Sequence, residues 1–198
     1  MSFSRLFVLA LYIAFLAFTI VLVNFALATY CGKFLPGAEK AGGFVWISFQ
    51  AWAMYFLAGC TLIGGVRTLL GYAVGIAASV GIMEIAKLLG AIPAPFDFAI
   101  AVFIIVIPLI MLEKLSLLLL DFVPAMFVGS GVFFAFMALN PNLAGEGLLF
   151  TLTKDLDSTV ASFQLYLNAA TTILAYCLLG LFYGWMTVSV RKRIAAEA

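Results

Sequence analysis

The sequence predicts an all-α, polytopic membrane protein in which about six transmembrane helices form one bundle. Two observations lead to this prediction. Hydrophobic residues make up 66% of the 198 residues and charged residues only 10%, with a mean hydropathy of +1.24, whereas about a quarter of the residues in a soluble domain are charged. The apolar residues also form long runs, and a helix needs roughly 20 of them to cross about 30 Å of hydrocarbon. The expected surroundings of the chain are therefore a lipid bilayer.

Short polar and proline-containing segments divide the chain into spans within a single membrane domain. The first apolar run, Leu6–Ala28, is longer than the roughly 7–15 residues of a signal-peptide core, so we interpret it as a span. Pro93 and Pro95 break the chain before the fourth span, and Glu113–Lys114 predicts a tight turn before the fifth. The expected spans cover about residues 6–28, 43–66, 68–89, 96–112, 115–139 and 163–190.

The distribution of basic residues predicts the orientation of these spans. Lysine and arginine resist translocation and stay on the cytoplasmic side of a membrane. With six spans, one side receives Arg5, Arg67, Lys114, Arg191, Lys192 and Arg193. The other side receives fewer basic residues, namely Lys33, Lys40, Lys87 and Lys154. We therefore expect both termini to be cytoplasmic.

Composition excludes several classes of function. A formal net charge of +1 offers no basic surface for nucleic acid, and the absence of histidine excludes imidazole catalysis and histidine ligation of haem. Cys31, Cys60 and Cys177 are isolated in the sequence, so we interpret them as packing residues. The sequence shows no nucleotide-binding loop, metal-ligand cluster or nucleophile motif. We expect no enzyme, no cofactor and no metal site.

Ionisable residues within the apolar runs are candidates for function because they are costly in lipid. Glu84 and Lys87 lie three residues apart on one helix face, where they form either an interfacial ion pair or part of a site. Asp121 lies near the start of the fifth span, where it either meets the cytoplasmic headgroups or serves a function. The uncharged Asn24 and Asn168 are interpreted as interhelical hydrogen-bonding groups.

Small residues at four-residue spacing predict where helices touch, because close backbone approach is a main source of adhesion between helices in lipid. Gly71, Gly75 and Ser79 mark one such face in the third span, and Gly180 and Gly184 mark another in the last span. Two interpretations remain open for these helix-packing residues. They lie inside the bundle, or they form an interface in a homo-oligomer or with another membrane protein.

A possible path for a solute is predicted from deep aromatic residues and from a proline. Trp52 and Tyr55 fall near the middle of the second span, deeper than the usual aromatic belts. Pro124 interrupts the expected fifth span, so the helix is predicted to bend or open near it. The segment from Asp121 to Gly129 is then predicted to face a cavity, with an ordinary proline kink as the alternative. The candidate solute-path residues are Gln50, Trp52, Tyr55, Asp121, Pro124, Ala125 and Gly129.

Four stretches carry a resemblance to a known family: Phe49–Gly59, Asp121–Gly129, Phe133–Ala135 and Gly180–Trp185. Together they resemble the YcdZ-like family of small bacterial inner-membrane proteins, over about residues 43–190. The resemblance implies a multi-pass protein of the bacterial inner membrane. That family has no known function, so the resemblance implies no substrate.

Two hypotheses of different class follow. The first is a channel or facilitator for a small neutral or weakly charged solute, which the interrupted helices, deep aromatic residues and sparse buried charge favour. The second is a structural or accessory subunit that binds another membrane protein, which the small-residue faces favour. The solute, any coupling ion and the oligomeric state are not encoded in any motif that the sequence contains.

Overall fold

The fold consists of helices throughout the part of the chain that the computed structural model describes, which comprises residues 3–114, 120–140 and 158–196. These ranges contain seven helices and no strand. The expectation of an all-α fold is thus confirmed for the described residues, whereas the number of spans stays a prediction. The helices are α1 (Phe3–Cys31), α2 (Ala38–Ala41), α3 (Val45–Leu57), α4 (Leu62–Leu88), α5 (Phe96–Met111), α6 (Val123–Leu139) and α8 (Ser158–Ala196).

Three described helices are long and apolar enough to cross a membrane, which is typical of a membrane protein. The three segments are Leu6–Cys31 in α1, Leu62–Leu88 in α4 and Ser162–Arg193 in α8. The other apolar helices, α3, α5 and α6, have 13, 16 and 17 residues. At a rise of 1.5 Å per residue they are about 20–26 Å long, which is shorter than the hydrocarbon layer.

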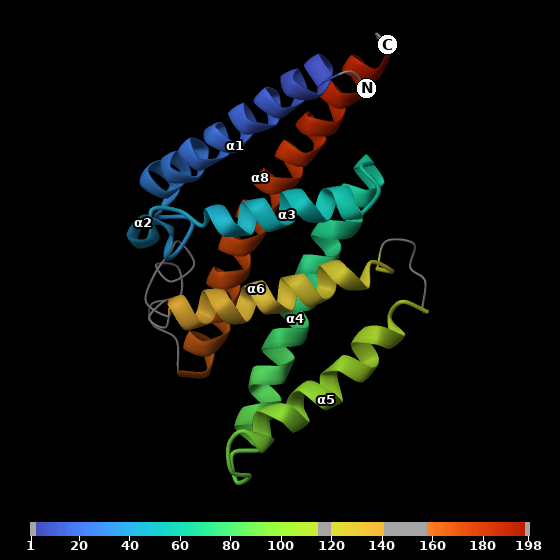
Figure 1. Cartoon of the computed structure of the whole chain (residues 1–198). Helices are drawn as coiled ribbons and strands as arrows, with labels where there is room; N and C mark the ends of the chain where they lie inside the picture. The colour runs from blue at the N-terminus through green and yellow to red at the C-terminus, as the bar shows by residue number, and fades with distance from the viewer. Residues whose placement is uncertain (1–2, 115–119, 141–157, 197–198) are drawn as a thin grey trace.

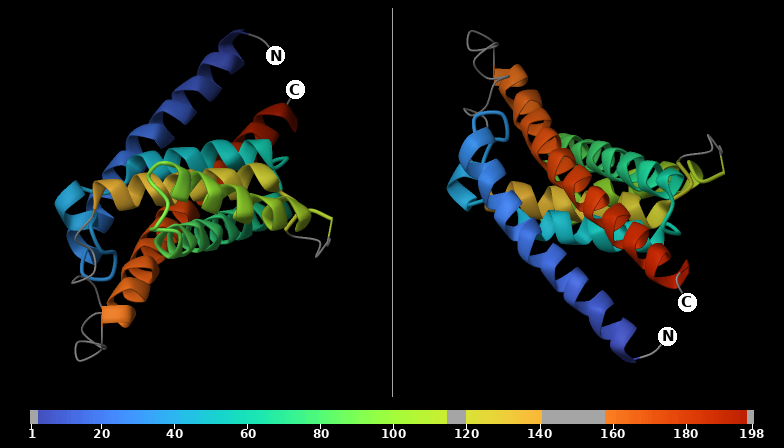
Figure 2. Two further views of the ribbon diagram at one scale, coloured as in Figure 1. Left: turned by 90° about the horizontal axis from the view of Figure 1, so that it is seen from below. Right: turned by 90° about the horizontal axis from the view of Figure 1, so that it is seen from above.

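The helices form one bundle in which α4 and α8 cross the shorter helices (Figure 1). The main packing partners are α4 with α6 and α5, and α3 with α8. Both chain termini lie at one end of the molecule, and the C-terminal end of α3 and the N-terminal ends of α4 and α6 point toward that end (Figures 1 and 2). Helix α1 diverges from the bundle toward its N-terminus (Figure 2).

The core lies where α4, α6 and α8 meet. Tyr72, Phe133, Phe136 and Tyr176 are its largest fully buried side chains. A smaller cluster of Leu16, Ile20, Trp52 and Tyr183 attaches α1 to α3 and α8. Aromatic rings fill much of this interior, so the helices are joined by broad side chains where their backbones separate and by small residues where they touch.

The boundary between the second and third expected spans differs from the prediction. The second span was expected to continue to residue 66, but α3 ends at Leu57 and α4 begins at Leu62. Gly59 and Cys60 adopt positive φ angles of 88° and 59°, which ends α3. The side chain of Thr61 then accepts a hydrogen bond from the Gly64 amide and caps α4. Arg67 therefore lies inside α4, in its second turn, rather than in the connection.

The start of the fifth expected span also differs. Helix α6 begins at Val123, and Leu120–Phe122 are not helical, while residues 115–119 lie outside the described part of the chain. Pro124 is consequently in the first turn of α6. A proline there loses no helical hydrogen bond, since the amides of the first turn have no partner within the helix. The backbone is not helical just before Pro124, at residues 120–122, but the proline starts α6 and does not bend a continuous helix. A proline suits a helix start as well as a kink, so its presence in the sequence does not distinguish the two.

Candidate functional site

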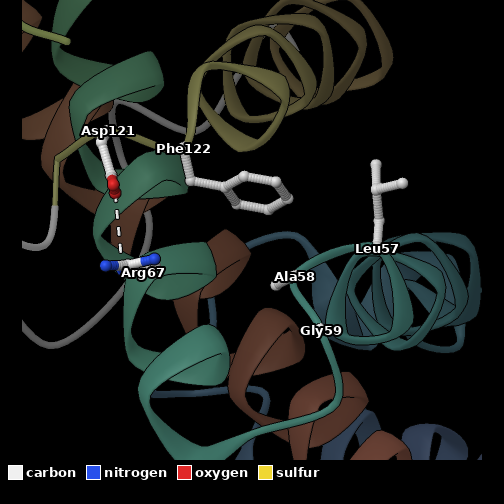
Figure 3. Close-up of a pocket in the computed structure, with 6 residues that line it drawn as sticks. All are labelled: Leu57, Ala58, Gly59, Arg67, Asp121 and Phe122. Atoms are coloured by element: carbon white, nitrogen blue, oxygen red, sulfur yellow. Dashed lines mark ion pairs between the residues drawn. The ribbon is translucent and has the colours of Figure 1, made fainter.

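A polar pocket lies at the end of the bundle that carries the two termini. Its volume is about 330 Å³, and its lining comes from three places: Leu57, Ala58 and Gly59 at the end of α3, Arg67 of α4, and Asp121 with Phe122 before α6. The two charged side chains point toward each other on one side of the pocket, and the ring of Phe122 extends from there toward α3 (Figure 3). Because helix ends surround it, the pocket sits where the membrane surface is expected.

The ion pair in this pocket joins α4 to the segment that precedes α6. The Nε atom of Arg67 lies 3.4 Å from Oδ1 of Asp121, and the two side chains are 37% and 40% exposed. An ion pair with this exposure contributes at most about 1 kcal/mol to stability. Asp121 was expected inside the fifth span, but it lies before the helix, so no buried carboxylate has to be accommodated there.

A second polar cluster lies at the opposite end of α4. The ammonium group of Lys87 donates to Oε1 of Glu84 at 2.6 Å and to the hydroxyl oxygen of Tyr166 at 2.8 Å. The hydroxyl of Tyr166 donates to the same Glu84 oxygen at 2.6 Å. The charged pair was predicted from its spacing, but the participation of Tyr166 from α8 was not. No group of three acidic or cysteine side chains within the described ranges is arranged to hold a metal ion.

A series of uncharged polar side chains is buried between the two ends of the bundle. On α8, Gln164, Asn168 and Thr172 follow one another at four-residue spacing, and all are buried. Asn24 of α1 and Ser48 of α3 are fully buried nearby. The Ser48 hydroxyl lies 3.2 Å from Oδ1 of Asn24 and 3.1 Å from the carbonyl oxygen of Tyr176, and Thr172 donates to the Pro36 carbonyl at 3.2 Å. We call these five side chains the polar core.

Sequence analysis identified only part of the polar core. Asn24 and Asn168 were noted as hydrogen-bonding groups, whereas Gln164, Thr172 and Ser48 were missed. The four-residue spacing on α8 was a usable signal, because residues i and i+4 share a helix face. Ser48 could not have been found this way, since its place depends on the packing of α3 against α8.

Several buried polar groups of the interior have no hydrogen-bond partner among the described residues. They include the Tyr72 hydroxyl and the indole N–H of Trp52. The Tyr176 hydroxyl has no hydrogen bond of acceptable geometry either, although the backbone of Phe44 lies close to it. A buried polar group without a protein partner costs roughly 1–3 kcal/mol, so such groups call for water or another bound molecule.

The predicted packing residues lie at contacts within the chain. A Cβ atom added to Gly71 would lie 2.5 Å from Cβ of Ala125, and one added to Gly75 would collide with the carbonyl oxygen of Met126. Gly129 contacts the backbone of Tyr72 in the same way. Ser79 extends this α4–α6 contact, since its hydroxyl lies 2.8 Å from that of Ser130. These side chains therefore hold α4 and α6 in close contact.

A second close contact joins α3 to α8. A Cβ atom added to Gly180 would collide with the carbonyl oxygen of Ser48, and one added to Gly184 would lie 2.8 Å from the side chain of Tyr55. The helix faces that suggested a subunit interface are thus occupied by neighbouring helices of the same chain.

The candidate solute-path residues are not brought together along one wall. Gln50 is exposed, whereas Trp52 is buried against α1 and α8 through Leu16, Ile20 and Tyr183. Tyr55 packs on Gly184 of α8. Ala125 and Gly129 face α4 rather than a cavity, and Pro124 is exposed at the start of α6. Asp121 alone among the seven lines the pocket.

Comparison with known proteins adds one finding to this geometry. Residues 10–190 match a family described as proteins of unknown function, DUF1097. The chain belongs to the DUF1097 family. The match covers all described helices except the residues of α1 before residue 10 and those of α8 after residue 190, and it supplies no activity. The name YcdZ-like stays a prediction. No curated protein and no solved structure matches the chain.

Proposed function

We propose that this DUF1097 protein is a channel or facilitator for a small neutral or weakly charged solute, and that it is not an enzyme. In this proposal about six helices cross the bacterial inner membrane, with both termini in the cytoplasm. The common position of the two termini at one end of the bundle supports an even number of crossings (Figure 1). The observation that carries the proposal is the polar core.

The polar core is costly to maintain inside a membrane protein. Amide and hydroxyl groups lose their hydration when they are buried, and each must recover a hydrogen bond to offset that loss. Hydrogen bonds between helices in a membrane contribute on average only about 0.6 kcal/mol each. We infer that five such buried side chains exceed what adhesion between helices requires, which favours a role in contacting a solute.

The chemistry of the polar core fits an uncharged solute. Gln164, Asn168 and Thr172 provide hydrogen-bond donors and acceptors over about 12 Å of the α8 axis, and none of the five side chains carries a charge. Selectivity in membrane pathways depends on such groups and on electrostatic barriers. An ion would find no opposite charge there, whereas a small molecule with hydroxyl or amide groups would exchange one set of hydrogen bonds for another. The partnerless hydroxyl of Tyr72 adds a further group for it to bond.

The exposed face of α1 favours a second function, that of an accessory subunit of another membrane protein. Large apolar side chains follow each other on α1 at alternating four- and three-residue spacing, and each is more than half exposed: Leu11, Phe15, Phe18, Leu22 and Phe25. This spacing is that of a helix seam which receives a partner helix. Lipid also covers such a face, so the stripe alone does not identify a second copy of the chain or another membrane protein.

Flux through proteoliposomes tests the facilitator proposal. Purified protein is reconstituted, and the entry of glycerol and of urea is followed by light scattering against protein-free vesicles. Two neighbouring threonines of α8 provide matched variants, because Thr172 is buried in the polar core and Thr171 is exposed. We expect Thr172→Val to lower the flux at least several-fold and Thr171→Val to leave it unchanged. Equal flux in both variants would contradict the assignment of the path.

Wild-type flux at the background level for both solutes would reject the facilitator. In that case the accessory role is tested by cysteine cross-linking at Phe18, after replacement of Cys31, Cys60 and Cys177. A specific cross-linked product in native membranes would support a partner helix on this face. The product should disappear when the cysteine is placed instead at a buried position of α1, such as Ile20.

A further inference from the structure

We propose that the pocket between α3, α4 and α6 binds a zwitterion, a compound that carries an ammonium group and an acidic group close together. Phosphoethanolamine has this chemistry, both as a free molecule and as the headgroup of a phospholipid. The inference does not depend on transport, because it concerns the pocket at the end of the bundle and not the polar core.

The charges around the pocket define what can bind. Arg67 and Asp121 stand on one side of it with opposite charges 3.4 Å apart, and both remain partly exposed. A simple anion that approached Arg67 would also meet the carboxylate of Asp121, and a simple cation near Asp121 would meet the guanidinium of Arg67. A ligand with both charges places its acidic group at Arg67 and its ammonium group at Asp121. All four neighbouring charges then alternate in sign.

The end of α3 adds an independent preference for an ammonium group. Leu57, Ala58 and Gly59 form the pocket wall opposite the ion pair (Figure 3). The C-terminus of a helix carries a partial negative charge, which basic residues in the last turn often neutralise. Helix α3 has no basic residue in its last turn. The amides of Ala58, Gly59 and Cys60 already donate to carbonyl oxygens of this last turn, so a positively charged ligand group would add only a favourable interaction with the partial charge of the helix end.

The shape and the position of the pocket fit a short ligand at the membrane surface. A volume of about 330 Å³ accommodates a headgroup-sized molecule. Phe122 and Leu57 offer apolar contacts to its carbon atoms, and their side chains flank the space between the charged pair and α3 (Figure 3). Because the pocket lies where helices end, a ligand can reach it from the bilayer as a lipid headgroup or from the aqueous phase as a free molecule.

Binding of phosphoethanolamine to the purified full-length protein in detergent tests the proposal. Inorganic phosphate and ethanolamine serve as controls, since each carries one of the two charged groups. We expect phosphoethanolamine to bind at least tenfold more tightly than either control, because hydrogen bonds to charged groups contribute enough for about a tenfold gain each. The lipid source is tested by native mass spectrometry of protein released from nanodiscs that contain equal amounts of phosphatidylethanolamine and phosphatidylglycerol.

Asp121→Asn is the decisive variant because it is nearly isosteric and lies in an exposed segment outside the helices. It should retain the fold but lose the preference for the ammonium group, so that phosphoethanolamine and phosphate bind alike. Arg67→Gln should weaken phosphoethanolamine at least tenfold. Glu84→Gln, which removes the ion pair at the opposite end of α4, is the matched control and should change nothing.

The possible results distinguish a lipid ligand from a soluble one and decide whether the proposal holds. Retention of phosphatidylethanolamine without binding of the free compound identifies a lipid site, and binding of the free compound alone identifies a soluble ligand. Both results support a zwitterion pocket. The proposal is overturned if neither form binds, if phosphate alone binds as tightly as phosphoethanolamine, or if Asp121→Asn keeps the ammonium preference.

Discussion

Gly75 offers the sharpest test of how α4 and α6 are held together. A methyl group at this position would collide with the Met126 carbonyl oxygen and would lie 2.8 Å from the Ser130 amide nitrogen. Both are backbone atoms, so the collision is relieved only if α6 moves away from α4. That movement would also weaken the hydrogen bond from the Ser130 hydroxyl to the Gly75 carbonyl, which is 2.8 Å long.

The magnitude follows from three contributions. Overpacking a tight contact costs about 1–3 kcal/mol, and each weakened interhelical hydrogen bond costs about 0.6 kcal/mol. The greater helix propensity of alanine over glycine returns up to about 1 kcal/mol. The net destabilisation expected for Gly75→Ala is about 1–3 kcal/mol. For a chain of this length that corresponds to a decrease of roughly 3–10 °C in the melting temperature.

The control is Gly131→Ala, because Gly131 lies in the middle of α6 but has no atom within 4 Å of an added Cβ. This variant should be neutral or slightly more stable, since only the helix propensity changes. Melting curves of the purified variants in one detergent, followed by tryptophan fluorescence, provide the comparison. If Gly75→Ala melts at or above the temperature of Gly131→Ala, the close contact between α4 and α6 does not exist in the protein.

Three further predictions follow from the helix ends and the buried contacts. Pro124→Ala should change the melting temperature by no more than a few degrees, because the proline occupies the first turn of α6, and a gain above about 6 °C would indicate a proline inside the helix. With the native cysteines replaced, Asp121→Cys should react rapidly with a small water-soluble maleimide while Ala125→Cys reacts slowly or not at all, since Ala125 is fully buried against α4; equal rates would refute this packing. A fluorescent protein fused after Ala198 should fluoresce and an alkaline phosphatase fusion there should be inactive, and the reverse result would refute cytoplasmic termini.

Local features of the sequence were sufficient to predict most helix positions. The start of a helix at residue 96 follows directly from the prolines that precede it in an apolar chain, and the structure has α5 at Phe96–Met111. The prediction failed at both places where a helix end depends on backbone conformation. At Gly59 and Cys60 a left-handed turn interrupts an apolar stretch, and at Pro124 one residue type suits both a helix start and a kink.

Only part of the candidate site could be predicted from local features of the sequence. Glu84 and Lys87 were predicted as a pair because three residues along a helix bring side chains to one face. Arg67 was counted only as a basic residue in a connection, and nothing in the sequence associates it with Asp121, which lies 54 positions further along. The candidate solute-path residues do not lie together, because the depth of a residue within a span does not specify which neighbouring helix it faces.

The sequence by itself determined the apolar surroundings that this protein requires, its all-α class, the polar connections between most of its helices and the small-residue faces available for contact. These properties depend on composition and on residues within about one helical turn of each other. The tertiary structure decided which face meets which. It placed Gly75 against Met126, brought Ser48 to Asn24, and joined Arg67 to Asp121 beside the end of α3. Such contacts arise from the relative rotation and crossing of helices, which residues far apart in the chain fix together and no local pattern records.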